Sequence, residues 1–183
     1  MPDDELTFRP AGPGDADAVA LLHADSWRRH YRGAYSDLYL DGDVVADRKT
    51  VWSARLAAPA SAATILAEDE TGLAGFVHVV FDDDEKWGSL VDNLHVVADR
   101  HRTGIGRRLM CRAGSAVVEH ATGNAVYLWV QEQNVRAQAF YRALGGIQVE
   151  KAAIEPPRGK PEWLVGAPNK FRIAWPDAAA LVG

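Results

Sequence analysis

The residues best suited to chemistry lie in one run, from Leu94 to Leu109, which reads LHVVADRHRTGIGRRL. An apolar, strand-like stretch ends within it, and Gly104 and Gly106 then open a stretch with helical spacing. Glycines let a ligand approach the backbone closely, and the first amide groups of a helix have no acceptor inside the helix. Because the helix dipole adds positive potential at the same place, this run predicts an anion site, best suited to phosphate.

Positive charge is concentrated in the same run. Residues 99–112 hold five arginines and one aspartate, a local charge of +4 in a chain of net charge −5, so the other residues carry −9. Arg107 and Arg108 fall in the first turn of the predicted helix, where the dipole disfavours cations unless a polyanion is bound. The alternative is a solvated arginine face beside an ordinary tight loop. The acidity of the remaining chain disfavours a nucleic-acid partner.

Two common nucleotide motifs do not fit the glycine run. The dinucleotide motif GxGxxG requires a small third residue where this chain has Leu109. The P-loop sequence GxxxxGK followed by Ser or Thr does not occur in the chain. The phosphate ligand is therefore neither of the two that these motifs bind.

A second informative segment spans residues 128–146 and reads LWVQEQNVRAQAFYRALGG. Asn134 opens a predicted helix and Tyr141 follows seven residues later, so both side chains share one helix face, about 10.5 Å apart. An Asn at the helix start can hydrogen-bond an extended ligand arm, and a Tyr two turns later can reach the end of that arm. The alternative is that Phe140 and Tyr141 are aromatic core residues.

Periodicity predicts the elements that hold these residues in place. Three β-rich stretches in succession, the first two joined by the turn sequence at residues 69–72, predict an antiparallel meander. The predicted strands cover residues 6–10, 63–68, 73–81, 90–97, 125–130, 147–151 and 171–175. The predicted helices cover residues 16–31, 43–57, 104–120 and 134–144. A meander followed by β-α-β-α predicts an α+β (α/β) fold with a mixed sheet and helices on its faces.

Composition narrows the class of protein. The 183 residues are 48% hydrophobic and 25% charged, which is typical of one globular domain over residues 1–183. The only cysteine is Cys111, and no Cys/His cluster has zinc-ligand spacing, so no metal is expected. Acidic residues occupy the N-terminus where a secretory signal would be basic, and no run approaches the roughly 18 apolar residues of a membrane span. A cytoplasmic location without a membrane partner is therefore expected.

Both informative segments resemble a known family. The sequence HisArgThrGlyIleGly at residues 101–106 is similar to the (Gln/Arg)xxGx(Gly/Ala) signature of the GNAT superfamily of acyl-CoA N-acyltransferases. Residues 128–146 resemble the family's second signature, and the match in order and spacing covers about residues 6–151. His101 stands where the family usually has Gln or Arg, and Gly146 where it often has Phe. The resemblance implies a GNAT-like fold, with the meander and the β-α-β-α unit arranged around a splayed central strand.

The resemblance also implies a cofactor and the residues that bind it. Acetyl-CoA would be the co-substrate, with its pyrophosphate on the glycine run and its pantetheine arm along the second segment. The residues that the resemblance assigns to cofactor binding are Leu94, His95, Val96, Arg102, Thr103, Gly104, Ile105, Gly106, Arg107, Asn134 and Tyr141.

Two catalytic roles follow from the same resemblance. Tyr141 would be the general acid that protonates the leaving thiolate. The backbone N–H of Val96, freed where the central strand splays, would stabilise the oxyanion of the tetrahedral intermediate.

The general base is open among three residues. An alkylamine with a pKa of about 10.4 is mostly protonated at neutral pH, so its proton must be accepted. Asp92 and His95 lie on the predicted strand, on opposite sides of it, and Glu132 lies just before Asn134. His95 has the ordinary pKa closest to neutrality, although a histidine in a strand is often structural.

The acceptor site is expected between the first two helices and the proline-containing loop before the last strand. Trp27 and Tyr31 lie one turn apart and are the candidate substrate-binding residues, the alternative being an aromatic stripe packed into the core. The acidic run at residues 82–85 would attract a cationic amine or be merely solvated.

These expectations combine into one hypothesis and an alternative. The hypothesis is an N-acetyltransferase that moves an acetyl group from acetyl-CoA to a primary amine of a small molecule or peptide, by direct attack in a ternary complex. The alternative is a non-catalytic module that senses acyl-CoA. Dimers are common in the family, so a homodimer is compatible with the resemblance.

Overall fold

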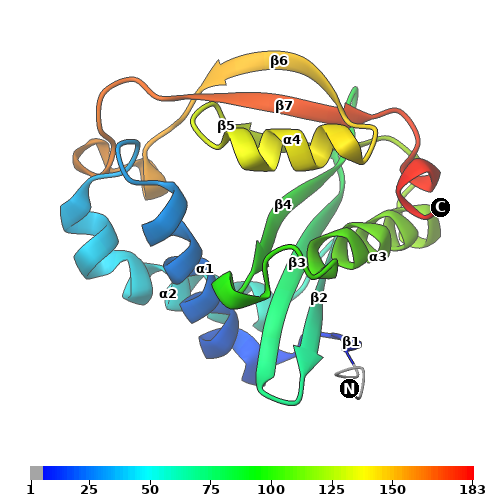
Figure 1. Ribbon diagram of the computed structural model, residues 1–183, viewed down its shortest axis with the longest axis horizontal. Coiled ribbons are helices and arrows are strands. Elements are labelled where there is room, and N and C mark those ends of the chain that lie inside the picture. Colours follow the sequence, from blue (N-terminus) through cyan, green and yellow to red (C-terminus); the bar gives the residue numbers. More distant parts are fainter. Residues whose placement is uncertain (1–5) are drawn as a thin grey trace.

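The computed structural model describes residues 6–183 as a seven-stranded mixed sheet with helices on both faces (Figure 1). The strand order across the sheet is β1-β2-β3-β4-β5-β7-β6. The strands are β1 Thr7–Pro10, β2 Ala62–Asp69, β3 Gly72–Asp84, β4 Gly88–Val96, β5 Val126–Gln131, β6 Ile147–Ala153 and β7 Asn169–Trp175. The helices are α1 Ala16–His30, α2 Val44–Ala57, α3 Ile105–His120 and α4 Val135–Ala143.

The predicted mixed α/β fold is confirmed, and the predicted bounds of its helices and strands differ from the observed ones by at most three residues. The largest difference is at β3, which runs on to Asp84 because the acidic hairpin pairs Asp84 with Gly88. The acidic residues at the extreme N-terminus, used above to argue against a secretory signal, lie outside the described residues. None of the helices in residues 6–183 is long and apolar enough to cross a membrane.

The two faces of the sheet bury different helices. On β3, Val77 and Val79 face the core that contains α3, whereas Phe76 faces α1 and α2. This alternation has the two-residue period of a strand. In Figure 1, α1 and α2 therefore lie to the left of the sheet and α3 to the right, with α4 below β7.

The sheet opens in its middle, between β4 and β5. These parallel strands pair only at Ser89–Val126 and Leu90–Tyr127. At Gly88, next to the pairing, a Cβ atom would lie 2.1 Å from the Ala125 carbonyl oxygen, so only glycine allows the strands to meet this closely. Beyond the paired residues β4 carries an irregularity in its register with β3, at Asp92, and diverges from β5. The predicted splayed central strand is therefore present.

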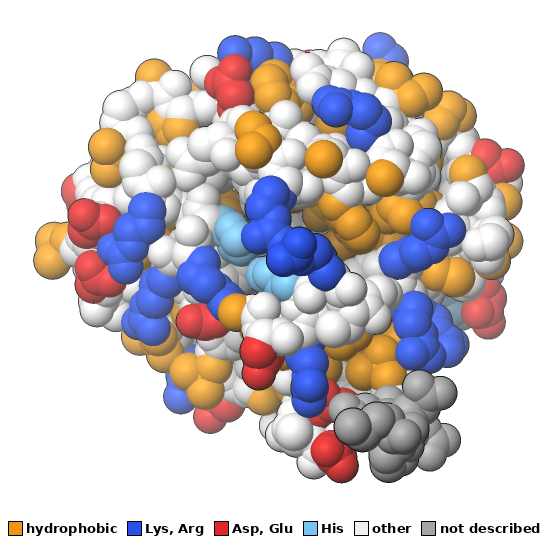
Figure 2. Space-filling view, viewed as in Figure 1, with side chains coloured by type: hydrophobic (Ala, Val, Ile, Leu, Met, Phe, Trp, Pro, Cys, Tyr) orange, Lys and Arg blue, Asp and Glu red, His pale blue; other side chains and the backbone are white. Residues whose placement is uncertain are grey.

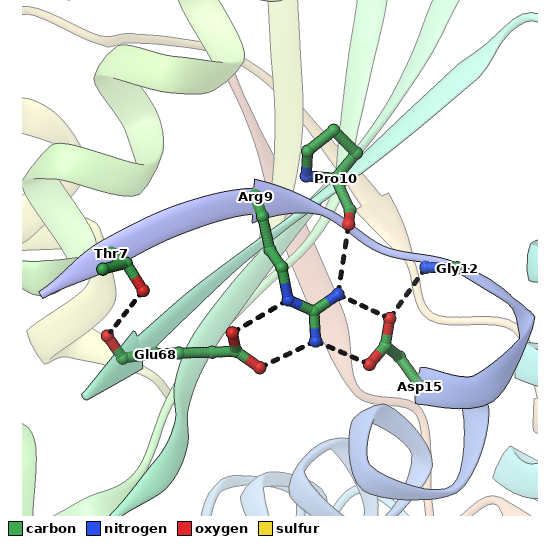
Figure 3. A network of polar contacts seen from close by, with 6 residues as sticks. All are labelled: Thr7, Arg9, Pro10, Gly12, Asp15 and Glu68. Carbon is green, nitrogen blue, oxygen red and sulfur yellow. Dashed lines mark hydrogen bonds and ion pairs between the residues drawn. The ribbon is translucent and has the colours of Figure 1, made fainter. Parts of the chain in front are cut away.

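An arginine clamp, formed by Arg9, Asp15 and Glu68, fixes where α1 starts relative to the sheet (Figure 3). Arg9 of β1 donates two hydrogen bonds to the carboxylate of Glu68 on β2, both 2.8 Å, and two to Asp15, at 2.9 and 2.8 Å. Asp15 also accepts from the Gly12 amide at 2.8 Å. Because such bidentate pairs fix geometry, the clamp ties the turn before α1 to the edge of the sheet.

The end of α4 explains the unusual Gly146. A Cβ atom there would lie 2.5 Å from Ile173 and 2.7 Å from Trp175, so the space of a side chain is already filled. Trp175 is buried and donates a hydrogen bond from its indole to the Leu144 carbonyl oxygen, at 3.0 Å. Trp175 of β7 thus fills the space that a side chain at position 146 would need.

Candidate active site

A cleft of about 870 Å³ lies where β4 and β5 diverge. Residues of α1, α2, β4, β5, β7, α4 and the start of α3 line it, so it is reached from both faces of the sheet. Figure 2 shows blue Lys and Arg side chains gathered beside pale-blue His side chains in the middle of this view. After the expectations above, the half beside α3 and α4 is called the cofactor-side half and the half beside α1 and α2 the acceptor-side half.

The start of α3 has the backbone expected of an anion site. Gly104 has a φ of 86°, in the left-handed region that favours glycine, and lines the cleft. The amide of Arg108 donates to the Gly104 carbonyl oxygen at 3.1 Å. The amides before it in the first turn therefore have no acceptor within the helix. Ile105 has its side chain in the core, and the Thr103 hydroxyl donates to the Arg100 carbonyl oxygen at 2.6 Å. Neither of these two side chains lines the cleft.

The arginine cluster divides into two groups. Arg102 and Arg107 are exposed and line the cleft. Arg100 also lines it but is paired with Asp69 at 2.9 Å. The remaining two, Arg108 and Arg112, stack on the ring of Phe8 in β1, at 4.7 and 4.9 Å from its centroid. The local charge of +4 is therefore not all directed at the cleft.

The end of β4 exposes backbone groups to the opening in the sheet. The Val97 amide donates to the Ala74 carbonyl oxygen of β3 at 2.9 Å. Because successive amides of a strand point to opposite edges, the N–H of Val96 points away from β3, toward the opening. His101 donates from Nε2 to the Val96 carbonyl oxygen at 3.0 Å, since a carbonyl oxygen can only accept. Leu94, Val96 and His101 all line the cleft.

Asn134 and Tyr141 both line the cleft from α4. The Asn134 side-chain oxygen accepts from the Ala137 amide at 3.1 Å and caps the helix, which leaves its NH₂ group to face a ligand. Burial, with the nearby Tyr31 phenol as a smaller cause, raises the pKa of Tyr141 above its ordinary value. Tyr141 therefore keeps its proton at neutral pH, as a general acid must.

The acceptor-side half contains an aromatic cluster. Trp27 stacks on Tyr31 with ring centroids 5.2 Å apart, and Tyr35 lies 4.7 Å from Tyr31. All three rings line the cleft, as does Arg48, whose guanidinium lies 4.4 Å above the Trp27 ring. The two predicted substrate-binding residues are thus together in the cleft. Both rings also pack against a core cluster, so their role in substrate binding stays a prediction.

The three candidate bases have different surroundings. Asp92 lines the cleft and forms an ion pair with Arg55, at 2.8 Å. His95 also lines it, but burial, followed by the charges of His30 and two arginines, lowers its pKa to about 3. Glu132 does not line this cleft; it is paired with Lys151 at 2.8 Å and accepts from Asn169 at 3.3 Å.

His95 belongs to a pair of stacked histidines. Its Nδ1 lies 2.8 Å from the Ser26 hydroxyl, and its ring stacks on His23 with centroids 4.6 Å apart. Trp52 donates to His23 Nδ1 at 2.9 Å, so the proton of the neutral His23 ring is on Nε2. Burial lowers the pKa of His23 well below its ordinary value, and both rings are therefore neutral at pH 7.

The acidic hairpin is engaged within the fold. Asp82, at a φ of 50°, accepts from the amides of Thr122 and Gly123, and Asp83 accepts from the Tyr127 hydroxyl. Asp84 accepts from the amides of Lys86 and Trp87. None of these aspartates lines the cleft, so the idea that they attract an amine to it is not supported.

Several cleft residues were not predicted from the sequence. They come from elements far apart in the chain and share only their place in the cleft: His23, Ser26, His30, Arg48, Arg55, Gln131, Arg136 and Lys170. Arg136 and Gln131 lie within the second segment, so a check of every polar residue beside Asn134 would have found them. Nothing in the local sequence marks Arg55 or Lys170. Within residues 6–183, no group of three or more His, Cys, Asp or Glu side chains is arranged to hold a metal ion.

Sequence comparisons identify relatives of this chain. The family model described as "Acetyltransferase (GNAT) family" matches residues 24–145. A curated relative from Bacillus subtilis (strain 168), "Uncharacterized N-acetyltransferase YuaI", is 26% identical over 180 residues, which is 96% of each chain.

Solved structures share the fold at lower identity. PaiA N-acetyltransferase from Thermoplasma acidophilum, in complex with coenzyme A, superposes with a TM-score of 0.71 at 16% identity, over 93% of this chain and 99% of that chain. Arabidopsis thaliana NAA60, in complex with acetyl-CoA, gives 0.66 at 16% identity, over 93% and 97%. A spermidine N-acetyltransferase SpeG mutant from Vibrio cholerae gives 0.67 at 16% identity, over 99% and 98%.

Proposed function

Because the chain belongs to the GNAT family of acetyltransferases, we propose that it transfers an acetyl group from acetyl-CoA to a primary amine of a small molecule or peptide. The observation that carries this proposal is the cleft at the splayed strand, which has the start of α3 with its arginines on one side of the sheet and an aromatic cluster on the other. Relatives with the same fold are crystallised with coenzyme A or acetyl-CoA, which supports the choice of cofactor.

The residues present fit that cofactor. The first-turn amides of α3 and the side chains of Arg102, Arg107 and Arg136 offer donors and positive charge to a pyrophosphate. Gly106 keeps the surface beside Phe140 low, since a Cβ atom there would lie 3.4 Å from the Phe140 ring. The NH₂ group of Asn134 and the free backbone edge of β4 would hold the pantetheine arm. When bound, acetyl-CoA supplies the activated acetyl thioester.

Two groups of this chain face the reacting atoms in the proposed mechanism. As the amine nitrogen bonds to the acetyl carbonyl carbon, the Val96 N–H donates to the carbonyl oxygen, on which negative charge develops. As the carbon–sulfur bond breaks, Tyr141 gives its proton to the departing sulfur. The raised pKa of Tyr141 suits this second role, because the phenol stays protonated until the thiolate forms.

Asp92 is the proposed proton acceptor for the amine. It is the one of the three candidates that both lines the cleft and is a carboxylate open to water, with 31% of its side chain exposed. The lowered pKa of His95, about 3, makes that ring a weak base, and Glu132 lies outside the cleft. Asp92 would accept the proton directly or through a water molecule, with Arg55 holding the carboxylate in place.

Direct attack in a ternary complex is favoured over an acetylated enzyme. The only cysteine, Cys111, does not line the cleft, and its thiol lies 3.8 Å from the Val182 carbonyl oxygen. We therefore expect initial-rate plots for the two substrates to intersect. Parallel lines would indicate a covalent intermediate and contradict this proposal.

Thiol release from acetyl-CoA with a panel of amines tests the function. Tyr141→Phe is expected to lower kcat by about 100-fold or more, the usual range for a lost general acid. Tyr127→Phe is the matched control, because Tyr127 is a buried tyrosine outside the cleft, bonded to Asp83. Equal rates for Tyr141→Phe and the wild type would remove Tyr141 from the mechanism. Binding of acetyl-CoA without turnover of any amine would support an acyl-CoA sensor instead.

A further inference from the structure

The acceptor-side half of the cleft has a wall built by β5 and β7. Gln131 and Lys170 are register partners on these antiparallel strands, so their side chains point to the same face of the sheet. Trp129 lies on that face too, because it is two residues from Gln131. The face is the acceptor-side one, since the alternate residues Leu128 and Val130 pack into the core beneath α3 and α4.

Gln131 has a buried amide without a partner. The residue is only 5% exposed, and neither its Nε2 nor its Oε1 has a hydrogen-bond partner within residues 6–183. A buried polar atom left unpaired costs about 1–3 kcal/mol, and such atoms are rare in folded proteins. Since Gln131 lines the cleft, a molecule bound there is the natural partner for this amide.

Lys170 stands beside it with an unneutralised ammonium group. Among residues 6–183, no carboxylate lies within 4.0 Å of its Nζ, which sits 4.5 Å from the Trp129 ring centroid. Burial lowers the pKa of Lys170, which agrees with an ammonium group that lacks a close counter-ion. Among the causes that raise the pKa of Lys170, the largest is the charge of Glu155, an exposed residue that also lines the cleft.

The opposite wall adds donors rather than acceptors. Arg55 Nη1 and His23 Nε2 are both buried and have no partner in the described part of the chain, and both residues line the cleft. Of the two carboxylates in the lining, Asp92 is already engaged by Arg55 and by the Asn93 side chain, at 2.8 and 2.9 Å. The unpaired polar atoms of this half are thus mostly donors, which a ligand rich in hydrogen-bond acceptors would satisfy.

We propose that the acceptor is an aminocarboxylate, whose carboxylate binds Lys170 and Gln131 while its amine faces Asp92. This inference rests on the proposed acetyl transfer and specifies the class of acceptor. One carboxylate oxygen would accept from the Lys170 ammonium and the other from the Gln131 NH₂ group. The alternative class, a polycationic amine, would place positive charge beside Lys170 and Arg55 and leave every one of these donors unpaired.

Aminocarboxylates of graded length provide the probe. Thiol release is measured with glycine, β-alanine and γ-aminobutyrate, each against its methyl ester, and with spermidine. The ester amines are less basic and hence more often deprotonated at neutral pH, so a preference for the free carboxylate cannot arise from the amine. Wild-type protein is expected to show about tenfold higher kcat/KM for at least one free carboxylate than for its ester.

Substitution of the lysine links this preference to the proposed site. Lys170→Met should raise the KM for the preferred carboxylate by about tenfold, leave kcat and the KM for acetyl-CoA within about twofold, and abolish the preference over the ester. Lys170→Arg should keep most of the preference for the free carboxylate over its ester. Lys160→Met is the matched control, because Lys160 also stacks on a tryptophan, 4.1 Å from the Trp163 ring centroid, but outside the cleft.

A binding measurement separates this inference from the proposed function. With coenzyme A present, at least one of the three aminocarboxylates should raise the melting temperature of the wild type but not of Lys170→Met. If this shift occurs without any acetyl transfer, it supports a carboxylate site at Lys170 and removes the proposed acetyl transfer. Transfer to esters or spermidine as fast as to the carboxylates would keep the function and overturn the inference. A changed KM for acetyl-CoA in Lys170→Met would likewise overturn the inference. Neither transfer nor a melting shift would overturn both.

Discussion

The arginine clamp and the acceptor-side half of the cleft use polar side chains in opposite ways. In the clamp, the Arg9 guanidinium donates hydrogen bonds of 2.8–2.9 Å to two carboxylates, although 43% of the Arg9 side chain is exposed. In the acceptor-side half, His23 Nε2, Arg55 Nη1 and both side-chain polar atoms of Gln131 are buried without a partner among residues 6–183. A hydrogen bond formed within the protein stabilises the fold modestly, whereas a buried donor or acceptor left without a partner destabilises it by more. The pairs of the clamp thus stabilise the fold, whereas the unpaired atoms of the acceptor-side half are those that the proposed acceptor would satisfy.

A second contrast occurs within α3 itself. Arg107 faces the cleft, whereas Arg108, the next residue, stacks on Phe8 of β1. A helix turns 100° per residue, so neighbours in the sequence face different surroundings. The same residue type at adjacent positions thus faces the cleft in one case and packs against an edge strand in the other.

The largest expected effect tests that contrast within α3. Arg102→Gln combined with Arg107→Gln should weaken acetyl-CoA binding about 100-fold, because two charge-assisted contacts of about 1.5 kcal/mol each are lost. Arg108→Gln combined with Arg112→Gln removes the same charge from the same region and should change the Kd less than about threefold. Calorimetric titration measures both. Equal losses in the two double variants would mean that overall charge, not position, binds the cofactor.

The next effect is the pH dependence of the free energy of unfolding, which differs between the buried histidines and the arginine clamp. Burial lowers the pKa of His95 to about 3 and of His78 to about 4, and it lowers that of His23 as well. Between these values and 6.5 the unfolded chain binds more protons, so stability falls as the pH drops below about 6.5, by up to about 1.4 kcal/mol per pH unit for each ring. Asp15 of the clamp has a lowered pKa, so its contribution is lost only as the pH falls below about 3.8.

Urea unfolding at pH 7, 6 and 5 checks this separation. His95→Gln should reduce the slope of the unfolding free energy against pH in this range, because one of the three rings no longer titrates. Arg9→Met should lower stability at every pH without altering that slope. A wild-type stability that is flat between pH 7 and 5 would contradict the account of neutral, buried histidines.

The smallest effect compares the two regions directly. Gln131→Leu removes an unpaired buried amide and should leave stability unchanged or raise it by about 1 kcal/mol, while weakening acceptor binding. Arg9→Met should lower stability by about 1 kcal/mol through loss of the exposed clamp and leave the KM for both substrates unchanged. Thermal unfolding and initial rates measure the two outcomes. A loss of stability in Gln131→Leu would show that the amide is satisfied within the protein.

The parts of this site that the sequence predicts are those set by local spacing. Gly104, Gly106, Asn134 and Tyr141 are fixed by their positions within single elements, and all of them line the cleft. The meander and the helix that follows it are likewise short-range patterns. The family resemblance added the splayed strand, which no single-strand periodicity indicates.

The parts that escaped prediction depend on long-range packing. Arg55 reaches Asp92 from a helix 37 residues away, and Lys170 reaches Gln131 only because β7 pairs with β5. Glu132 illustrates the reverse: it is adjacent to the second segment, yet it follows the end of β5 and turns to Lys151. One residue of shift at a strand end decides which side of the sheet a side chain occupies.

A crystal structure of the complex with coenzyme A tests the central claim most directly, that cofactor and acceptor occupy opposite halves of one cleft. The account predicts the pyrophosphate on the first-turn amides of α3, the thiol beside Tyr141 and Val96, and the wall of Gln131 and Lys170 left open to solvent. Coenzyme A bound along that wall, or with its thiol away from Tyr141, would contradict it.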